Sequence, residues 1–289
     1  MKDKAKGYIF SVLGNVAFGL QPIFVKLLAK YGVSALTAPL IRAIGMTIMF
    51  FALCLVKKEK LWPGIKEMPK LLGLAFSGMA LTPTLLFLSY NYIDTGTSTT
   101  LCFIYPVFVM LFGVLLYKDK ISLKTVLALA ICFGGIVLIS NPGGNFDLRG
   151  LAFALGGGTA YGAYVLFLDK TQVQDKLGVN VYNFWFFLLG GLMLAAFNIV
   201  NGTASEIILP LSGWPAAIAF IVDSGIFAAV FFQISVKYLG GIISSILGAL
   251  EPLTSVIAGA LILGEALTVR GVAGCLLVLC GTLLVVNRK

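Results

Sequence analysis

The chain has 289 residues, of which 59% are hydrophobic and only 11% are charged, with no histidine and a formal net charge of +9. A soluble domain carries about 25% charged residues, so this chain has too few polar side chains to cover a water-exposed surface. Its basic residues do not form a basic domain with interleaved aromatic residues, which excludes a nucleic-acid-binding module. The lipid bilayer is the expected solvent for most of the chain, because a spanning helix needs about 20 predominantly apolar residues.

The first apolar run, residues 7–29, follows a basic N-terminus and has the length of a spanning helix. It is longer than the roughly 7–15-residue core of a signal peptide and lacks a convincing cleavage site. Nine more apolar runs follow in chain order, at 35–56, 71–93, 96–117, 122–141, 150–169, 181–200, 215–237, 241–264 and 268–287. The sequence therefore predicts an all-α polytopic membrane protein with ten transmembrane helices.

Lysine and arginine side chains concentrate in alternate loops. With the N-terminus inside, sixteen of the 21 basic residues fall on the cytoplasmic side and four on the outside, while Arg42 lies within a span. Cytoplasmic loops of membrane proteins carry the excess of basic residues. This distribution predicts a multi-pass protein of the cytoplasmic membrane with both termini in the cytoplasm.

The two halves of the chain resemble each other. KGYIFSVLGNVAFG at 6–19 matches RGLAFALGGGTAYG at 149–162, and IYPVFVMLFGVLLYKDKIS at 104–122 matches LEPLTSVIAGALILGEALT at 250–268. Self-similarity of this kind indicates a duplicated structural unit.

Each unit contains five predicted spans, so the first repeat covers 1–141 and the second covers 149–289. Because five is an odd number, the second repeat crosses the membrane in the opposite direction to the first. Inverted repeats are typical of secondary transporters, whose substrate site lies near mid-membrane between the repeats. The sequence thus predicts a transporter with two inverted five-helix repeats.

On these residues the chain resembles the ten-span EamA type of the drug/metabolite transporter superfamily over essentially its whole length. The matching positions are Phe18-Gly19 with Lys26, Arg42, Pro106, Asp119, Glu251-Pro252 and Gly264-Glu265. Phe18 stands where the family has tryptophan, and Asp119 where glutamate is more common. The resemblance implies export or exchange of small metabolites, including amino acids, amines and drugs, often driven by a proton or substrate gradient.

Glu251 is the leading candidate for a coupling residue, because ionisable side chains inside spans are rare and usually functional. A carboxyl group removed from water binds a proton more readily. Pro252 removes a backbone donor and kinks the helix, and Pro106 does the same in the first repeat, where Tyr105 replaces the acid. The alternative is a paired or protonated glutamate that only positions the kink.

Three further ionisable residues lie inside predicted spans. Asp223 has small neighbours, so it is either functional or bonded across a packed helix interface. Arg42 has the planar fork that suits a substrate carboxylate, or it forms a structural ion pair with Asp223 or Glu251, or it reaches the outer headgroups. Lys26 either balances charge in the site or extends to the membrane interface.

Uncharged polar and aromatic side chains inside the spans complete the candidate cavity, since tyrosine and tryptophan offer an apolar face with a polar tip. Each of them alone also fits simple packing or an interfacial belt. These candidates are Asn15, Gln21, Tyr90, Asn91, Tyr105, Tyr161, Tyr164, Trp185 and Gln233.

The leading hypothesis is a secondary transporter that moves a small amphiphilic metabolite outward by alternating access, with protons as one candidate coupling ion. A flippase of a lipid-linked carrier is the alternative within transport. A membrane-embedded enzyme is disfavoured, because the chain lacks histidine and its five cysteines have no metal-ligand spacing. We expect no metal and no cofactor, and the sequence predicts no oligomeric state.

Overall fold

The computed structural model of the chain describes residues 2–34, 36–89, 91–93, 98, 101–139, 147–263 and 269–286. Every regular element in these ranges is a helix, and no strand occurs in them. Five helical segments within the described ranges have the length and composition to cross a membrane: Lys4–Ala29, Ala38–Val56, Leu148–Thr171, Val179–Val200 and Leu211–Leu239. The prediction of an all-helical membrane protein is confirmed, while the count of ten spans stays a prediction.

The helices follow the predicted apolar runs in order. The first half contains α1 (Lys2–Ala29), α2 (Ala38–Val56), α3 (Met68–Leu74), η1 (Ala75–Leu81), α4 (Thr82–Ser89), α6 (Tyr105–Tyr117) and α7 (Leu123–Ile139). The second half contains α8 (Leu148–Thr171), α9 (Val173–Leu177), α10 (Val179–Val200), η2 (Ala204–Ile207), η3 (Leu211–Gly213), α11 (Trp214–Ile221), η4 (Val222–Val230), α12 (Phe231–Leu239), α13 (Gly241–Leu247), α14 (Leu250–Leu263) and α15 (Val269–Val286).

Prolines mark where several of these helices begin. Pro39, Pro69, Pro106 and Pro215 lie in the first turns of α2, α3, α6 and α11. Proline suits that position, because its missing N–H has no intrahelical partner there and its fixed φ is already helical. The corresponding helices of the two repeats, α3 and α11, start in the same way.

Four of the predicted spans are interrupted rather than regular. The third and the eighth contain π-helical turns, η1 and η4, with α-helix before and after each of them. The ninth breaks at Gly248-Ala249, between α13 and α14, and in the fourth a turn at Phe103-Ile104 precedes α6. Pro106 and Pro252 both lie in the first turn after a break. Irregular backbone at membrane depth is tolerated where it is buried in protein or lines a cavity.

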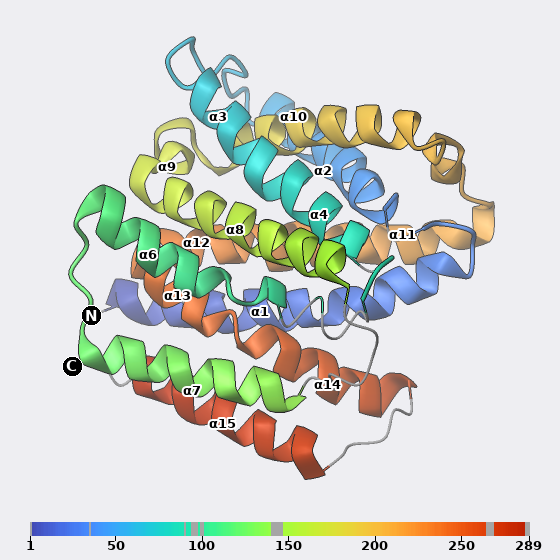
Figure 1. Ribbon diagram of the computed structural model, residues 1–289. Coiled ribbons are helices and arrows are strands. Elements are labelled where there is room, and N and C mark those ends of the chain that lie inside the picture. Colours follow the sequence, from blue (N-terminus) through green and yellow to red (C-terminus); the bar gives the residue numbers. More distant parts are fainter. Residues whose placement is uncertain are drawn as a thin grey trace.

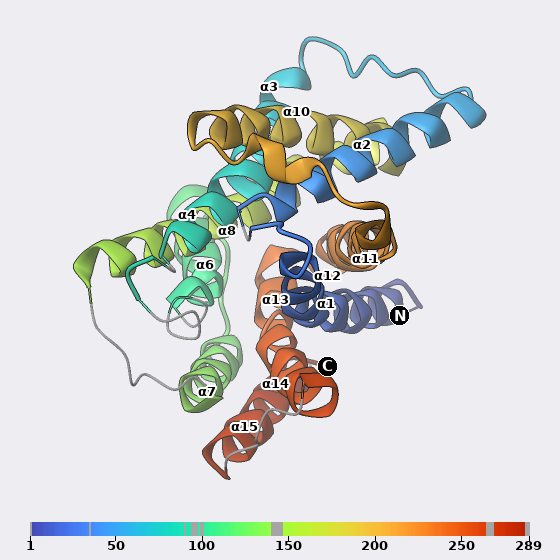
Figure 2. The ribbon, with the colours of Figure 1, turned by 90° about the vertical axis from the view of Figure 1, so that its right-hand side faces the viewer.

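The helices pair across the two halves of the chain. α1 packs against α12 and α14, α8 packs against α4 and α6, α2 packs against α10, and α7 packs against α15. Figure 1 shows α2 and α10 along one side of the bundle and α7 with α15 along the opposite side. In the same view, α1 begins and α15 ends at one end of the bundle. Figure 2 shows α1 and α12 in the middle, between these two pairs.

Glycines allow the close contact of α7 with α15. A β-carbon at Gly135 would lie 2.7 Å from the carbonyl oxygen of Gly274, and one at Gly281 would lie 2.9 Å from the carbonyl oxygen of Ala128. Such small residues let the backbones of membrane helices approach each other. The pair is therefore held at a distance that only glycine permits.

We expect Gly135→Ala to destabilise the protein, because the added methyl group has to push α15 away. Overpacking of this kind costs about 1–3 kcal/mol, which thermal unfolding in detergent measures as a lower midpoint. Gly134→Ala is the matched control, since a β-carbon at Gly134 meets nothing within 4 Å. Equal unfolding midpoints for the two variants would contradict the tight contact.

Candidate transport site

An aromatic cluster occupies the interface between the two halves of the chain, and Tyr161 of α8 is at its centre. The ring of Tyr161 contacts that of Tyr105 edge to face, with centroids 4.6 Å apart and planes at 72°. It stacks on Tyr164, at 5.8 Å, and on Phe232, at 6.0 Å. Tyr105, Tyr164 and Phe232 are almost fully buried. Helices α6, α8 and α12 thus bring aromatic rings together from both repeats.

Tyr105 joins the interrupted fourth and ninth spans. Its hydroxyl donates a hydrogen bond of 3.1 Å to the carbonyl oxygen of Ser245, in the last turn of α13 before the break at Gly248. The hydroxyl lies so close to Gly248 that no β-carbon would fit there. Glycine at position 248 is therefore needed for this contact between the repeats.

Arg42 brings a positive charge from α2 to one side of the cluster. Its guanidinium interacts electrostatically with Tyr161 and Tyr164, and its Nη2 contacts the sulfur of Met79 at 3.3 Å. The Nε atom is buried and has no hydrogen-bond partner within the described residues. No carboxylate of the described part of the chain lies within ion-pair distance of Arg42, so the predicted alternatives of a pair with Asp223 or Glu251 are not seen in the structure.

Glu251 brings a carboxyl group from α14 to the cluster. It lies in the first turn of that helix, where its amide donates to the carbonyl oxygen of Gly248 at 3.0 Å. Its carboxylate interacts electrostatically with Tyr105, Tyr161 and Cys102. In the described part of the structure this carboxylate makes no ion pair. Tyr161 therefore interacts with a guanidinium from one repeat and a carboxyl group from the other.

Asp223 lies in the π-helical segment η4, apart from that cluster of charges. It is 8% exposed, and its Oδ2 atom is buried with no hydrogen-bond partner in the ranges that the structure describes. π-helical turns inside α-helices occur frequently at functional sites. Gln21 of α1 likewise has a buried side-chain nitrogen with no partner among the described residues. The two side chains remain candidates, and no hydrogen bond between them is seen.

The other predicted site residues divide into two groups. Gln233 is buried and donates to Asn183 at 3.0 Å, and Asn15 is buried and donates to the carbonyl oxygen of Ser11 at 2.7 Å. Of the remaining four, three lie outside the aromatic cluster and one lies outside the described residues. Asn91 is exposed in a turn, Trp185 donates at 2.7 Å to the carbonyl oxygen of Leu61, Lys26 is exposed near the end of α1, and Tyr90 lies outside the described residues.

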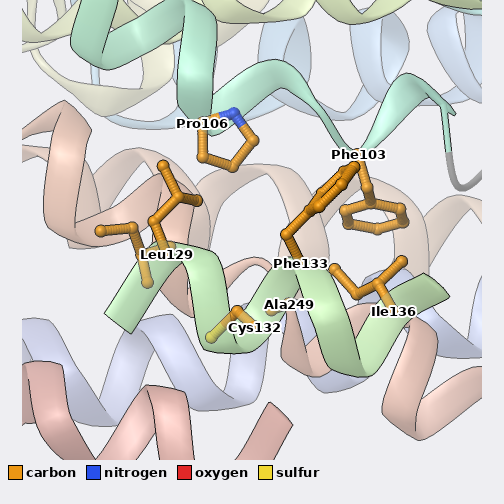
Figure 3. A pocket seen from close by; sticks show the side chains of 8 residues that line it. Phe103, Pro106, Leu129, Cys132, Phe133, Ile136 and Ala249 are labelled. Atoms are coloured by element: carbon orange, nitrogen blue, oxygen red, sulfur yellow. The ribbon is translucent and has the colours of Figure 1, made fainter. Parts of the chain in front are cut away.

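A small apolar cavity of about 10 Å³ lies beside the two helix breaks. Figure 3 shows Phe103 and Pro106, from the fourth span, opposite Leu129 and Cys132 of α7. A space of this size holds about one water molecule, and its lining has no charged group. It is too small and too apolar to be the solute site, but it leaves free space next to the breaks.

Sequence reasoning missed the ion pairs at the end of the bundle where α1 begins. Lys170 of α8 lies 2.6 Å from Asp119, which follows α6, and Lys237 of α12 lies 2.6 Å from Asp175 of α9. In the sequence Lys170 follows an apolar run, which gives no sign of a partner. Only the packing of α8 against α6 brings it to the carboxylate of the other repeat.

Helices of membrane-spanning length around a buried, doubly charged aromatic cluster define a polytopic membrane transporter. The EamA-like transporter family matches the chain twice, at residues 5–141 and 148–287, and the chain belongs to this family. It is therefore a transporter and not an enzyme, and the resemblance recognised in the sequence is confirmed.

Curated relatives carry the same general description. An uncharacterized transporter of Archaeoglobus fulgidus is 27% identical over 288 residues, covering 98% of this chain and 100% of that protein. An uncharacterized transporter of Clostridium kluyveri is 26% identical, covering 96% of this chain and 92% of its own. The uncharacterized transporter YcbK of Bacillus subtilis is 24% identical, with 95% and 91% covered. A solved crystal structure has the same fold, with a TM-score of 0.79 and 15% identity over 100% of this chain and 99% of that one.

Proposed function

We propose that the protein is a secondary active transporter that exports or exchanges a small amphiphilic metabolite of the amino-acid or amine class by alternating access. It lies in the cytoplasmic membrane with ten spans and both termini in the cytoplasm. The first repeat, 1–141, rocks against an inverted second repeat, 149–289. Glu251 is the coupling residue, with a proton as the coupling ion, and Arg42 balances its charge.

The observation that carries this proposal is that ionisable groups from the two repeats, Arg42 and Glu251, both interact with the buried tyrosine cluster around Tyr161. Arg42 and Glu251 both interact with that ring, yet neither has an oppositely charged partner among the described residues. Buried charges without partners are costly, so they are expected where a ligand supplies the missing partner. A carboxylate fits Arg42, an ammonium group fits Glu251, and the tyrosine rings offer apolar surface to the rest of the solute.

Equivalent contacts in the two halves support the inverted repeats. A β-carbon at Gly14 of α1 would lie 3.1 Å from the amide nitrogen of Phe232, and one at Gly157 of α8 would lie 3.3 Å from the amide nitrogen of Leu86. The two glycines are aligned in the repeats, and their partners follow the π-helical segments η4 and η1. Two similar halves with reciprocal contacts are suited to two conformations of similar energy, one open to each side.

A resistance screen tests the proposal. Cells that lack their own exporters would express the chain and grow with toxic analogues of amino acids, amines, nucleobases and sugars. We expect increased tolerance to an amino-acid or amine analogue, because export lowers its internal concentration. Correctly inserted protein that protects against no analogue of these two classes would contradict the proposed substrate class, and tolerance confined to nucleobase or sugar analogues would replace it.

A further inference from the structure

The two repeats share a short motif before their second helices. Residues 32–34 read Gly-Val-Ser before α2, and residues 178–180 read Gly-Val-Asn at the start of α10. Both glycines have a positive φ, 84° at Gly32 and 79° at Gly178, a conformation that favours glycine. Ser34 and Asn180 are therefore equivalent positions on equivalent turns.

A second shared motif follows the same helices. Glu59 stands four residues before Pro63 after α2, and Glu206 stands four residues before Pro210 after α10. The segment between the helix end and the glutamate is three residues longer in the second repeat, so an ungapped comparison of the halves does not align them. Both glutamates are half-buried.

The structure joins these motifs crosswise between the repeats. The amide nitrogen of Ser34 donates to Oε2 of Glu206 at 2.9 Å, and Nδ2 of Asn180 donates to Oε1 of Glu59 at 2.9 Å. We call the first contact the outer clasp and the second the inner clasp. α2 and α10 pack along each other (Figure 1), and the clasps tie the start of each helix to the loop after the other, at opposite ends of the pair.

Each clasp has a second hydrogen bond beside it. At the outer clasp, the hydroxyl of Thr37 donates to Glu206 at 2.7 Å. At the inner clasp, the indole nitrogen of Trp185 donates to the carbonyl oxygen of Leu61, as described above. Hydrogen bonds to a charged group such as Glu206 are stronger than those between neutral groups. Both ends of the pair are therefore held more strongly than by packing alone.

The interface between the clasps is tight and apolar. Phe50 of α2 and Phe187 of α10 are stacked, with centroids 6.2 Å apart and planes at 8°. A β-carbon at Gly191 would lie 3.1 Å from the β-carbon of Ala43. The two helices thus contact each other between the clasps as well as at both ends.

The geometry points to a fixed axle: α2 and α10 stay tied by both clasps throughout the transport cycle, and the remaining helices of the first repeat rock against those of the second around this pair. This rests on the alternating access of the proposed function. In alternating access, a gate at one membrane face is open while the gate at the other face is closed. The two clasps lie at opposite ends of one helix pair and are both closed in the same structure. They therefore do not behave as a pair of alternating gates. The axle carries Arg42, which makes Glu59 and Glu206 positioning residues for that guanidinium.

The outer clasp is charged at neutral pH. Burial raises the pKa of Glu206, but the hydrogen bonds from Ser34 and Thr37 outweigh burial and hold the pKa below the usual value of 4.5. A depressed pKa in the folded protein gives a stabilisation that is present above the unfolded value and is lost as the pH falls through the folded one. The outer clasp therefore weakens only in acid, as the pH falls through the folded pKa of Glu206.

Distance measurements between spin labels test the axle without a transported solute. Labels at Lys57 and Val179 report the inner clasp, and labels at Lys30 and Ser205 report the outer one, since all four side chains are exposed. Cys275 is partly exposed and Cys280 is exposed, so both are replaced by alanine to keep the label from reacting there. The other three cysteines are buried and stay in place. In lipid nanodiscs, in mildly acidic and in neutral buffer, both above the usual glutamate pKa of 4.5, we expect one narrow distance at each clasp. A second distance at either clasp in the otherwise unchanged protein overturns the axle.

Variants of the glutamates identify which contact holds each end. Glu59→Ala should add a second, longer distance at the inner clasp only, and Glu206→Ala should do so at the outer clasp only. Asp147→Ala is the matched control, because Asp147 pairs with Arg149 inside one repeat, and it should change neither distance. If both glutamate variants keep a single unchanged distance, the clasps do not hold the axle and the inference is wrong.

A third label pair separates this inference from the proposed function. Lys118 and Lys176 are exposed near the ion pairs of Asp119 and Asp175. For helices that move around a fixed axle, we expect two distances between the labels at Lys118 and Lys176, and a single distance between the labels at each clasp. A single distance at all three label pairs contradicts the alternating access of the proposed function. The clasps are then still closed, as inferred.

Discussion

Replacement of Glu251 by glutamine is expected to abolish proton-driven transport while the protein stays folded. Glutamine keeps the shape of the side chain but can neither bind and release a proton nor offer a negative charge to an ammonium group. Removing one partner of a buried ion pair costs about 3–5 kcal/mol, roughly 10²- to 10⁴-fold in affinity. Proteoliposomes with an imposed pH gradient and radiolabelled amino acids and amines measure the loss as a fall in initial uptake rate.

Glu67→Gln is the matched control for this experiment, because Glu67 pairs with Lys70 at 2.8 Å, in the first turn of α3 and outside the aromatic cluster. It should leave the uptake rate and its pH dependence unchanged. Thermal unfolding of both variants checks that they are folded. If Glu251→Gln transports at the rate of the original protein and with the same pH dependence, Glu251 only shapes the break before α14.

The helical content and the repeats could be predicted because both depend on patterns along the chain. Apolar runs of span length predicted where helices lie, and the alignment of Gly14 with Gly157 predicted two positions that turned out to make equivalent close contacts. The π-helical segments η1 and η4 could not be predicted. Apart from Asp223 and one Ser-Gly pair in each segment, their sequences are apolar, and no pattern in them distinguishes a π-helical turn from an α-helical one.

Much less of the candidate site could be read from the sequence. Periodicity shows that Trp185 lies in a helix, but only the fold shows that its indole bonds to Leu61 near the inner clasp and not within the aromatic cluster. The interactions of Tyr161 with both Arg42 and Glu251 depend on how three helices cross, which no spacing in one sequence records. The motifs around Glu59 and Glu206 were readable, but the three-residue insertion hides their alignment.

Arg42 occurs only in the first repeat and Glu251 only in the second, so neither has an equivalent ionisable residue in the other repeat. Tyr105 stands at the position equivalent to Glu251, and the stretch of α10 equivalent to the surroundings of Arg42 is apolar. The aromatic rings and the helix breaks are therefore shared architecture, whereas each charge belongs to one repeat only. If a solute binds between these charges, its two ends are recognised by different repeats, and Arg42 selects for the presence of a carboxylate.

Replacement of Arg42 by glutamine is therefore expected to remove the preference for an amino acid over its decarboxylated amine. The loss of a charge-assisted contact to a carboxylate costs about 1.5–3 kcal/mol, roughly 10- to 150-fold, and only the solute that has the carboxylate should lose it. Competition between an amino acid and the matching amine in proteoliposomes measures the change directly. Arg149→Gln, which alters an exposed arginine that pairs with Asp147, should keep the original preference.

Stability separates this role of Arg42 from a structural one. The buried Nε of Arg42 has no hydrogen-bond partner among the described residues, and an unpartnered buried polar group costs about 1–3 kcal/mol, a cost that an apolar side chain would not have. We expect Arg42→Met to unfold at the same temperature as the original protein or at a higher one, while it transports no amino acid. A lower unfolding temperature, with equal losses for the amino acid and its amine, would show that Arg42 holds α2 in place and does not select the solute.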